Sequence, residues 1–349
     1  MNKIRIGKRM VGEGHPVFII AEVGVNHNGK IILAKRLIDS AKKAGADAVK
    51  FQAFKTEDLV TRGIKMADYQ KKNIGKKSSQ LKMLKKLELK YEDFIQIKKY
   101  CDKRSILFLC TPHSEDVIDF LEPLIPAYKI GSGDLTNLPF LRKIAEKKKP
   151  IILSTGMATL SEVEEAIKVI RNNGIAQIVL LHCTTNYPCS MEDVNLKAME
   201  TMRKRLNCPV GYSDHTQGII ASIMAATMEA VVIEKHFTLN KNLPGPDHKA
   251  SLEPNELKEM ITAIRNTEKA LGDGVKEPTK SEKKIKRVVR KNIVARVDIN
   301  KGSKISREML TIKRAGFGIE PKYIDKIIGR KAIDAIKKDK PIIWNKIEI

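Results

Sequence analysis

The amino-acid sequence predicts a (β/α)8 barrel of the TIM type, in the α/β class, followed by a small C-terminal domain. The chain has 349 residues, 42% of them apolar, which is enough for one large core and one small one. Over its first two thirds, eight short apolar segments alternate with amphipathic segments of helical periodicity. This alternation ends after Gly272. Eight strands alternating with helices over roughly 250 residues are typical of the barrel.

The eight apolar segments have the features of buried parallel strands. Each is rich in Val, Ile or Leu and ends at Gly, Pro or a polar cluster. An open, doubly wound sheet is the alternative fold, but no G-x-G-x-x-G motif follows the first segment, which favours the barrel. The predicted strands span residues 17–24, 46–54, 105–112, 127–133, 150–156, 177–184, 209–214 and 230–237.

Two segments between the strands show clear helical patterns. In the segment 34–46, four apolar residues fall on one helical face, namely Leu37, Ile38, Ala41 and Ala44. In the segment 161–174, Ser161 and Glu164 predict a capping box and Gly174 predicts the helix end. The longer basic segment 56–104 predicts an inserted loop followed by a helix.

The C-terminal part predicts a separate small domain. Residues 274–290 are charged and rich in turn formers, which predicts a linker after a barrel domain spanning 1–273. Residues 291–349 have short apolar segments broken by Gly and Pro. A piece of this size builds only a modest core, so we expect it to lean on other surfaces.

Charge and composition exclude several classes of protein. The formal net charge of +24 would attract polyanions, but the lysines are spread along the chain without aromatic residues between them. This pattern predicts a solvated surface and no nucleic-acid partner. No apolar run approaches the roughly 20 residues of a membrane helix, and no signal peptide is evident. Five cysteines without a C-x-x-C pair indicate free thiols in a reducing compartment. We therefore expect a cytoplasmic protein.

Polar residues gather at the ends of the predicted strands, where the active sites of such barrels lie. Each residue alone has a structural explanation, for example a satisfied core group. Burying several lysines and carboxylates together without a ligand would be costly, however. Two lysines and several hydroxyls at one mouth suit a small ligand with phosphate and carboxylate groups. The candidates are Glu22, Asn26, His27, Asn28, Lys50, Gln52, Thr111, His113, Lys129, Ser132, Ser154, Thr155, His182, Thr184, Ser213, His215, Glu234 and His236.

Two histidines among these candidates suggest a metal site. His215 and His236 follow neighbouring predicted strands, and Glu234 lies two residues before His236. The i, i+2 spacing points Glu234 and His236 to the same side of their strand. Two imidazoles with a nearby carboxylate and open positions suit Mn²⁺, Zn²⁺ or Fe²⁺.

These strand ends carry a series of motifs that resembles one family. In chain order, the motifs are EVGVNHNG, VKFQ, TPHS, KIGSGDL, STGMA, HCTTNYP, GYSDHT and EKHFTLNKNLPGPDHKASLEP. They are similar to those of the sialic acid synthases, which make nine-carbon acidic sugars (nonulosonates). Residues 293–332 resemble the antifreeze-like (SAF) domain that ends these enzymes. The resemblance covers most of the chain.

The resemblance implies a transferase reaction and assigns roles to residues. Phosphoenolpyruvate condenses with an N-acetylmannosamine-type sugar and water, phosphate is released, and a divalent metal, Mn²⁺ or Mg²⁺, polarises the aldehyde. His215 and His236 would bind the metal. The catalytic group would comprise Glu22, as a general base or water-orienting group, Lys50 and Glu234. Phosphoenolpyruvate would be held by Lys50, Thr111, Lys129, Ser132, Ser154 and Ser213, and the sugar by Gln52, Tyr187, Asp247 and Arg314.

The resemblance also bears on the assembly and on the sugar. The antifreeze-like domain of the family reaches the barrel of a partner subunit, so Arg314 would complete the partner's site in a domain-swapped homodimer. Thr185 stands where synthases of N-acetylneuraminate often have Asn, and Asn186 follows it. This departure favours a diacetamido-trideoxy sugar, as in the synthesis of legionaminate.

Two other functions are compatible with parts of the pattern. A Schiff-base aldolase would use Lys50 or Lys129 as a nucleophile, which requires an apolar pocket and a lowered pKa. A non-catalytic carbohydrate- or nucleic-acid-binding protein would release no phosphate. Lysines next to hydroxyls are more typical of anion binding than of imine formation, which favours the synthase.

Overall fold

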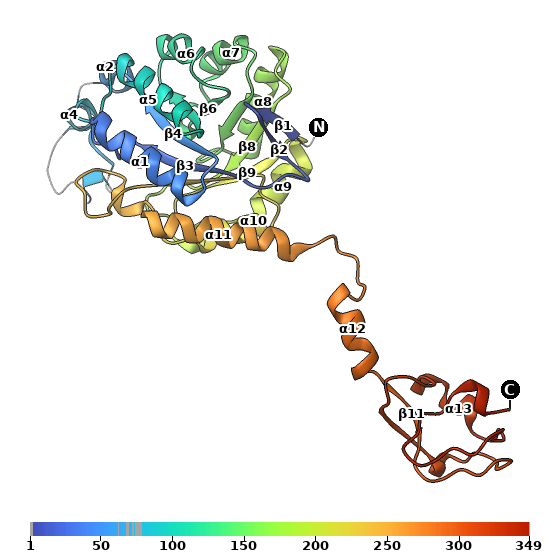
Figure 1. Cartoon of the computed structure of the whole chain (residues 1–349). Coiled ribbons are helices and arrows are strands. Elements are labelled where there is room, and N and C mark those ends of the chain that lie inside the picture. The colour runs from blue at the N-terminus through green and yellow to red at the C-terminus, as the bar shows by residue number, and fades with distance from the viewer. Residues whose placement is uncertain (1–2, 62, 68–69, 72, 74–78, 349) are drawn as a thin grey trace. The chain divides into compact units, whose positions relative to one another are not determined.

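The chain forms two compact units, which are described separately. The computed structural model describes residues 3–61, 63–67, 70, 71, 73 and 79–348. The first unit comprises Met1–Gly272 and the second Asp273–Ile349. Figure 1 shows the course of the chain through both units.

The first unit is built on eight parallel strands, and all eight sequence predictions are confirmed. The hydrogen-bonded order is β5-β4-β3-β10-β9-β8-β7-β6, in which the first and last strands of the ring, β3 and β10, are neighbours. The two ends of this order, β5 and β6, also lie in contact. The strands are β3 (Phe18–Gly24), β4 (Ala48–Ala53), β5 (Leu107–Pro112), β6 (Tyr128–Ile130), β7 (Ile151–Ser154), β8 (Ile178–His182), β9 (Val210–Asp214) and β10 (Val232–His236).

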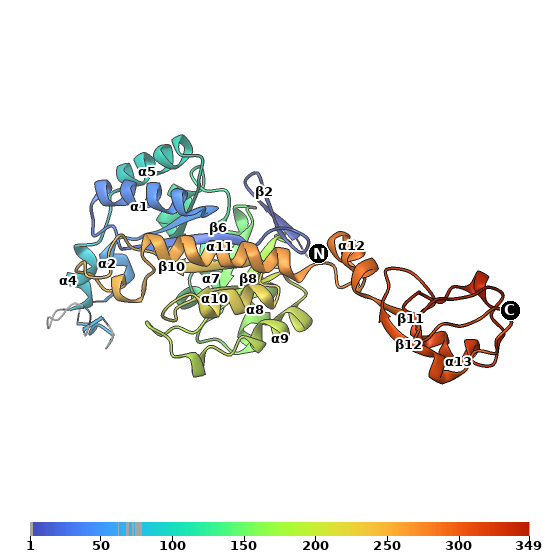
Figure 2. The ribbon, with the colours of Figure 1, turned by 60° about the horizontal axis from the view of Figure 1, so that its bottom comes forward.

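Helices cover the outside of these strands (Figure 2). The predicted apolar face of α1 is confirmed, because Leu37, Ile38, Ala41 and Ala44 are all buried. A large cluster of buried apolar side chains fills the layer between strands and helices. The helices are α1 (Ile31–Ala44), α2 (Thr56–Leu59), α4 (Gln80–Lys85), α5 (Tyr91–Lys103), α6 (Glu115–Leu121), α7 (Leu138–Glu146), α8 (Leu160–Asn172), α9 (Lys197–Leu206), α10 (Ile220–Thr227) and α11 (Pro254–Leu271).

The predicted capping box of α8 is wrong by two residues. Thr159 caps the helix instead of Ser161: its hydroxyl accepts from Glu162 N at 3.4 Å, and Thr159 N donates to the Glu162 carboxylate at 2.6 Å. The sequence offers two overlapping Thr/Ser-x-x-Glu pairs, and the earlier start places Leu160 in the helix, where it packs against the core. The helix ends two residues before Gly174, whose φ of 83° terminates it as predicted.

The segment 56–104 contains more helix than the predicted loop and single helix. α5 is the predicted helix, and the short helices α2 and α4 precede it. Around them lies a small apolar cluster of Val25, Phe54, Met66, Met83 and Leu87. Part of the segment, residues 62, 68–69, 72 and 74–78, lies outside the described residues.

An N-terminal hairpin was not predicted. Strands β1 (Lys3–Ile6) and β2 (Arg9–Gly12) pair antiparallel around Gly7, which has a φ of 58°. Ile4, Ile6 and Val11 join a second cluster with inward-facing strand residues such as Phe18 and Ile20, so the hairpin closes the N-terminal end of the barrel. Within the described residues, no helix is long and apolar enough to cross a membrane.

The second unit has its own core. It contains α12 (Lys280–Val289), the antiparallel strands β11 (Lys291–Ala295) and β12 (Leu310–Arg314), and the short helix α13 (Ile324–Ile327). Eleven buried apolar side chains form the core, from Ile293 to Ile347. Helix α12 occupies most of the segment 274–290 and buries none of its side chains.

Candidate active site

The inward-facing residues change from apolar to polar along each strand. On β4, Ala48 belongs to the apolar cluster inside the barrel, and Lys50 follows it on the same side. On β10, Val232 occupies the same apolar level, and Glu234 follows it. The period of two therefore places an apolar floor below a polar layer, and the polar layer lies at the C-terminal ends of the strands.

This polar layer surrounds a cavity of about 190 Å³. Every residue to which the resemblance assigns a role lines it, except Asp247 and Arg314. Of the other strand-end candidates, His113 lines it, and the rest do not, namely Asn26, His27, Asn28, Thr155, His182 and Thr184. The lining residues are Glu22, Lys50, Gln52, Thr111, His113, Lys129, Gly131, Ser132, Gly133, Ser154, Cys183, Thr185, Tyr187, Ser213, His215, Glu234 and His236.

Lys50 lies between two carboxylates at the centre of the layer. Its Nζ is 3.2 Å from Glu22 Oε2, 3.3 Å from Glu234 Oε2 and 3.4 Å from Thr111 Oγ1. Burial alone would lower the pKa of Lys50, but the two carboxylates outweigh burial and raise it. Lys50 is therefore a permanent cation. Burial raises the pKa of Glu22 against the opposing effect of Lys50, so Glu22 is the more readily protonated of the two acids.

The second lysine, Lys129, is held by a hydroxyl. Its Nζ donates to Ser154 Oγ at 2.7 Å and lies 3.4 Å from Glu234 Oε1. Burial lowers the pKa of Lys129, although Glu234 opposes this shift. Burial would raise the pKa of Glu234, but the two lysines and a 2.9 Å hydrogen bond from Ser213 bring it to about 2. Glu234 is thus the more readily ionised of the two acids, and it lies at ion-pair distance from both lysines.

The cluster leaves hydrogen-bonding capacity unused. The buried Oε2 atoms of Glu22 and Glu234 have no hydrogen bond from any described residue, although both lie at ion-pair distance from Lys50. The geometry at Lys50 therefore favours charge attraction over directed hydrogen bonds. An anionic ligand in the cavity would accept from Lys50 and Lys129 and complete their coordination.

The two histidines have the properties of metal ligands. Their ring centroids are 5.8 Å apart, and the Tyr187 ring lies 4.2 Å from His215 and 5.5 Å from His236. His215 Nδ1 donates to Thr184 O at 2.7 Å, which leaves its Nε2 as an acceptor. His236 Nδ1 is buried without a hydrogen-bond partner among the described residues.

The electrostatics keep both imidazoles neutral. Burial lowers the pKa of His215 to about 4 and that of His236 well below its usual value. Neutral imidazole is the form that binds a metal. In the part of the chain that the structure describes, no group of three or more His, Cys, Asp or Glu side chains is arranged for a metal ion. The chain therefore offers two imidazoles, and a bound ion would take its other ligands from substrate or water.

Four further lining residues were assigned no role from the sequence, namely His113, Gly131, Gly133 and Cys183. Cys183 Sγ is 3.2 Å from Ser132 Oγ, which also accepts from Gly156 N at 3.0 Å. A Cβ at Gly156 would collide with Thr185 and lie 2.8 Å from Ser132 Oγ, so a side chain at this position would displace the groups of the cavity wall. His113 and Thr185 complete the wall. The signal for Cys183 was its position directly after the sixth strand.

Two predicted sugar-binding residues lie elsewhere. Asp247 is buried next to the short helix His248–Ala250, and burial, aided by the charge of Glu22, raises its pKa to about 7. Arg314 is exposed at the end of β12 in the second unit. Their roles remain predictions.

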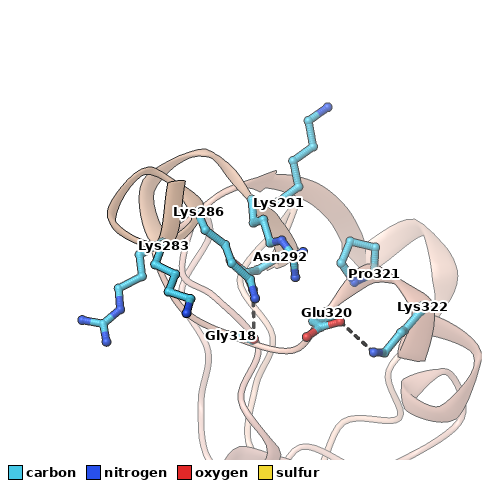
Figure 3. A pocket seen from close by; sticks show the side chains of 11 residues that line it. Lys283, Lys286, Lys291, Asn292, Gly318, Glu320, Pro321 and Lys322 are labelled. Atoms are coloured by element: carbon cyan, nitrogen blue, oxygen red, sulfur yellow. Dashed lines mark hydrogen bonds and ion pairs between the residues drawn. The ribbon is translucent and has the colours of Figure 1, made fainter. Parts of the chain in front are cut away.

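A larger cleft, of about 760 Å³, belongs to the second unit (Figure 3). Lysines and arginines of α12 form one wall, and residues around Gly318 and Glu320 form the other. Asn292 donates to Gly318 O at 2.9 Å, and Glu320 pairs with Lys322 at 2.9 Å. The cleft contains none of the predicted site residues, and its cations are surface side chains solvated by water.

The chain matches two family models and is similar to several known synthases. A model of the NeuB family matches residues 37–276, and a model of the SAF domain matches residues 290–348. The N,N'-diacetyllegionaminic acid synthase of Legionella pneumophila is 46% identical over 97% of this chain and 96% of its own length. The enzyme of the same name from Campylobacter jejuni is 49% identical over 93% of this chain and 98% of its own length. Among solved structures, the N-acetylneuraminic acid synthetase of Leptospira borgpetersenii aligns with a TM-score of 0.72 and 34% identity, over 81% of this chain and 94% of that one.

Proposed function

Because the chain belongs to the NeuB family and ends in an SAF domain, we propose that it is a nonulosonate synthase of the legionaminate type. It would condense phosphoenolpyruvate with 2,4-diacetamido-2,4,6-trideoxy-mannose and water, and release phosphate. Two relatives named N,N'-diacetyllegionaminic acid synthase, at 46% and 49% identity, support this choice of sugar. Thr185, which lines the cavity in place of the Asn of many neuraminate synthases, also supports it.

The observation that carries the proposal is the buried cation and hydroxyl cluster at the barrel mouth. Lys50 and Lys129 are 4% and 2% exposed, and each has a hydroxyl within 3.4 Å. Because Glu22 and Glu234 already offset part of this positive charge, a phosphoenolpyruvate anion would be held by the lysines together with the neighbouring hydroxyls. Lys50, Lys129 and the hydroxyls of Thr111, Ser132, Ser154 and Ser213 would hold its phosphate and carboxylate groups.

The reaction forms one carbon–carbon bond and, at the other enol carbon, replaces the carbon–oxygen bond to phosphate by one to the oxygen of water. The methylene carbon of phosphoenolpyruvate attacks the aldehyde carbon of the open-chain sugar, and the aldehyde oxygen takes up a proton. Water adds to the other enol carbon, and phosphate leaves with its bridging oxygen. Glu22 is suited to orient this water or accept its proton, because its buried Oε2 has no hydrogen bond from a described residue.

A divalent ion, Mn²⁺ or Mg²⁺, would supply Lewis-acid polarisation of the aldehyde oxygen. His215 and His236 are the residues suited to hold it. The carbonyl of Thr184 fixes the tautomer of His215, and the Tyr187 ring packs against its imidazole. Glu234 accepts from Ser213 and keeps both lysines in place from the same wall.

The sugar would lie against Gln52 and Tyr187, with Asp247 at the edge of the site. Gln52 Nε2 already donates to Glu22 Oε1 at 2.9 Å, so a sugar contact at Gln52 would also align Glu22. Arg314 would reach the sugar's N-acetyl group from a partner subunit, in a domain-swapped homodimer. Five buried free cysteines fit a synthase that works in the cytoplasm.

Phosphate release tests the proposal. Purified protein is incubated with phosphoenolpyruvate and the diacetamido-trideoxy sugar, N-acetylmannosamine or no sugar, each with Mn²⁺ or with a chelator. We expect release that requires both sugar and metal and is faster with the diacetamido sugar. No release with either sugar in the presence of metal would overturn the assignment.

One observation favours a second function that needs an explicit test. Burial lowers the pKa of Lys129, as an imine-forming lysine requires. A Schiff-base aldolase would be trapped irreversibly by borohydride in the presence of a keto acid, with a mass increase on Lys129. The synthase forms no imine, so we expect no adduct.

A further inference from the structure

A second buried ion pair lies directly behind the two histidines, on the outer face of the strands. Asp214 and Lys235 are register partners on β9 and β10, and their side chains are 2.8 Å apart and fully inaccessible to solvent. Each immediately precedes one of the histidines, His215 and His236. The preceding outward positions on these strands, Tyr212 and Ile233, belong to the apolar layer beneath the helices.

Asp214 and Lys235 together form hydrogen bonds with every polar group of Thr216. Asp214 Oδ1 accepts from both the backbone N and the Oγ1 of Thr216, each at 2.8 Å. Lys235 Nζ donates to Thr216 O at 2.7 Å. Thr216 follows His215, so the pair fixes the backbone on both sides of that histidine.

The same contacts tie in the loop that orients the imidazoles. Thr216 forms a parallel bridge with Cys189, and Cys189 N donates to His215 O at 2.8 Å. The loop ending at Cys189 carries Thr184, whose carbonyl accepts from His215 Nδ1, and Tyr187, which packs against both rings. The ion pair therefore anchors both the strand ends and the loop.

A contribution to the stability of the fold does not by itself explain an ion pair that is inaccessible to solvent at this position. Replacing a buried pair by apolar residues of similar volume is often neutral or stabilising, so such a pair is weak evidence for a structural role. We propose that Asp214 and Lys235 are positioning residues that hold His215 and His236 as a preformed two-imidazole metal site. This inference rests on the proposed function, because it concerns the metal of that site.

The double variant Asp214→Asn/Lys235→Met tests the pair, because it removes both charges and leaves no buried charge unpaired. We expect it to bind Mn²⁺ at least about tenfold more weakly, as replaced outer ligand-positioning groups typically do. The absorption spectrum of bound Co²⁺ should shift, because it reports ligand geometry. High Mn²⁺ should restore much of the phosphate release, and the KM for phosphoenolpyruvate should stay within about twofold of wild type.

A matched control lies at the opposite end of the barrel. Asp47 is also a buried carboxylate: its Oδ2 accepts from Ile19 N at 2.9 Å and pairs with Arg265 at 3.2 Å. Asp47→Asn should lower the melting temperature without changing the Mn²⁺ affinity or the Co²⁺ spectrum. If the double variant does not fold, as judged by circular dichroism, Thr216→Val, which removes only the hydroxyl that donates to Asp214 and leaves the ion pair intact, should show a smaller loss of Mn²⁺ affinity.

The outcomes separate the two proposals. Wild-type protein that binds Mn²⁺ and releases phosphate, together with a folded variant of unchanged Mn²⁺ affinity and Co²⁺ spectrum, would overturn the positioning role alone. An equal loss of Mn²⁺ affinity in Asp47→Asn would also overturn it, since the loss would then follow general destabilisation. Wild-type protein that binds no Mn²⁺ and releases no phosphate would overturn both proposals.

Discussion

The two ends of the barrel are built from alternate inward positions of the same strands but have opposite chemistry. At the N-terminal end, Ile6 and Val11 of the hairpin pack with Phe18 and Ile20 in a dry apolar cluster. Two residues farther along β3, Glu22 faces Lys50 within a set of buried charges, some of which lack hydrogen-bond partners in the described chain. The residues at the N-terminal end stabilise the fold. The buried charges at the C-terminal end serve the reaction and lower the stability of the fold.

The largest expected effect is at the polar end. Lys50→Met removes the cation between Glu22 and Glu234 and one holder of the anionic substrate. Removing a single preorganised donor typically costs 10²–10³-fold in rate, and a buried charge adds to this, so we expect kcat/KM for phosphate release to fall by about a thousandfold or more. The variant should remain folded, because the pKa of Glu22 is already raised and the acid can take up a proton.

The control for Lys50→Met is Asp47→Asn, whose carboxylate pairs with Arg9 and Arg265 at the other end. In steady-state kinetics, Lys50→Met should lose far more kcat/KM than Asp47→Asn. In thermal melts, Asp47→Asn should show the larger fall in melting temperature. A comparable loss of kcat/KM in Asp47→Asn would break the division between the two ends.

The next effect is at the apolar end. Ile6 is fully buried under the barrel, and Ile6→Ala removes three methylene-sized groups from the closing hairpin. Such substitutions cost about 2–5 kcal/mol, measurable as a lower denaturant midpoint. The kcat/KM at 25 °C should be unchanged. An altered KM for phosphoenolpyruvate in Ile6→Ala would show that the hairpin also affects the geometry of the active site.

A smaller, pH-dependent effect is expected at Asp247, near the polar end. Its pKa is raised from 3.8 to about 7, so the folded protein binds a proton that the unfolded chain has lost. This contribution to stability is complete below pH 3.8 and is lost as pH rises through about 7. At about 1.4 kcal/mol per pKa unit, the loss is on the order of a few kcal/mol.

Asp247→Asn should remove that dependence. We expect the variant to melt higher than wild type at pH 8, higher by a smaller margin at pH 5 and close to it at pH 3.8, because the amide mimics the protonated acid. Thermal melts across this range check the sign. A variant that is less stable than wild type at pH 8 would show that the ionised carboxylate has a partner.

The polar end was largely predictable from the sequence, and the apolar end was not. Strand periodicity and the position of strand ends are local signals, so the sequence alone assigns residues such as Lys50 and Glu234 to one mouth. The hairpin pattern of Ile4 and Ile6 is only four residues long, and its burial depends on the distant strands that it covers. Local signals do not contain such long-range contacts.

The same limit applies within the site. Asp214 and Lys235 are 21 positions apart, and only the parallel register of β9 and β10 makes them partners. The prediction that Cys183 is a free buried thiol is confirmed, but nothing in its sequence neighbourhood indicates its 3.2 Å contact with Ser132. Arg314 lies in the second unit, so its assignment depends on assembly and remains a prediction.

The smallest expected effect concerns the cap of α8, where local sequence was misinterpreted. Thr159→Ala removes the hydroxyl that accepts from Glu162 N, and loss of a cap typically costs about 1 kcal/mol. Ser161→Ala should change stability by only a few tenths of a kcal/mol, because Ser161 sits inside the first turn and has no capping role. Urea unfolding of both variants distinguishes a helix capped by Thr159 from one capped by Ser161. A larger loss of unfolding free energy in Ser161→Ala than in Thr159→Ala would support the capping box predicted from the sequence. The start of α8 follows the C-terminal end of β7, which carries Ser154, but neither Thr159 nor Ser161 lines the cavity, so neither change should affect phosphate release.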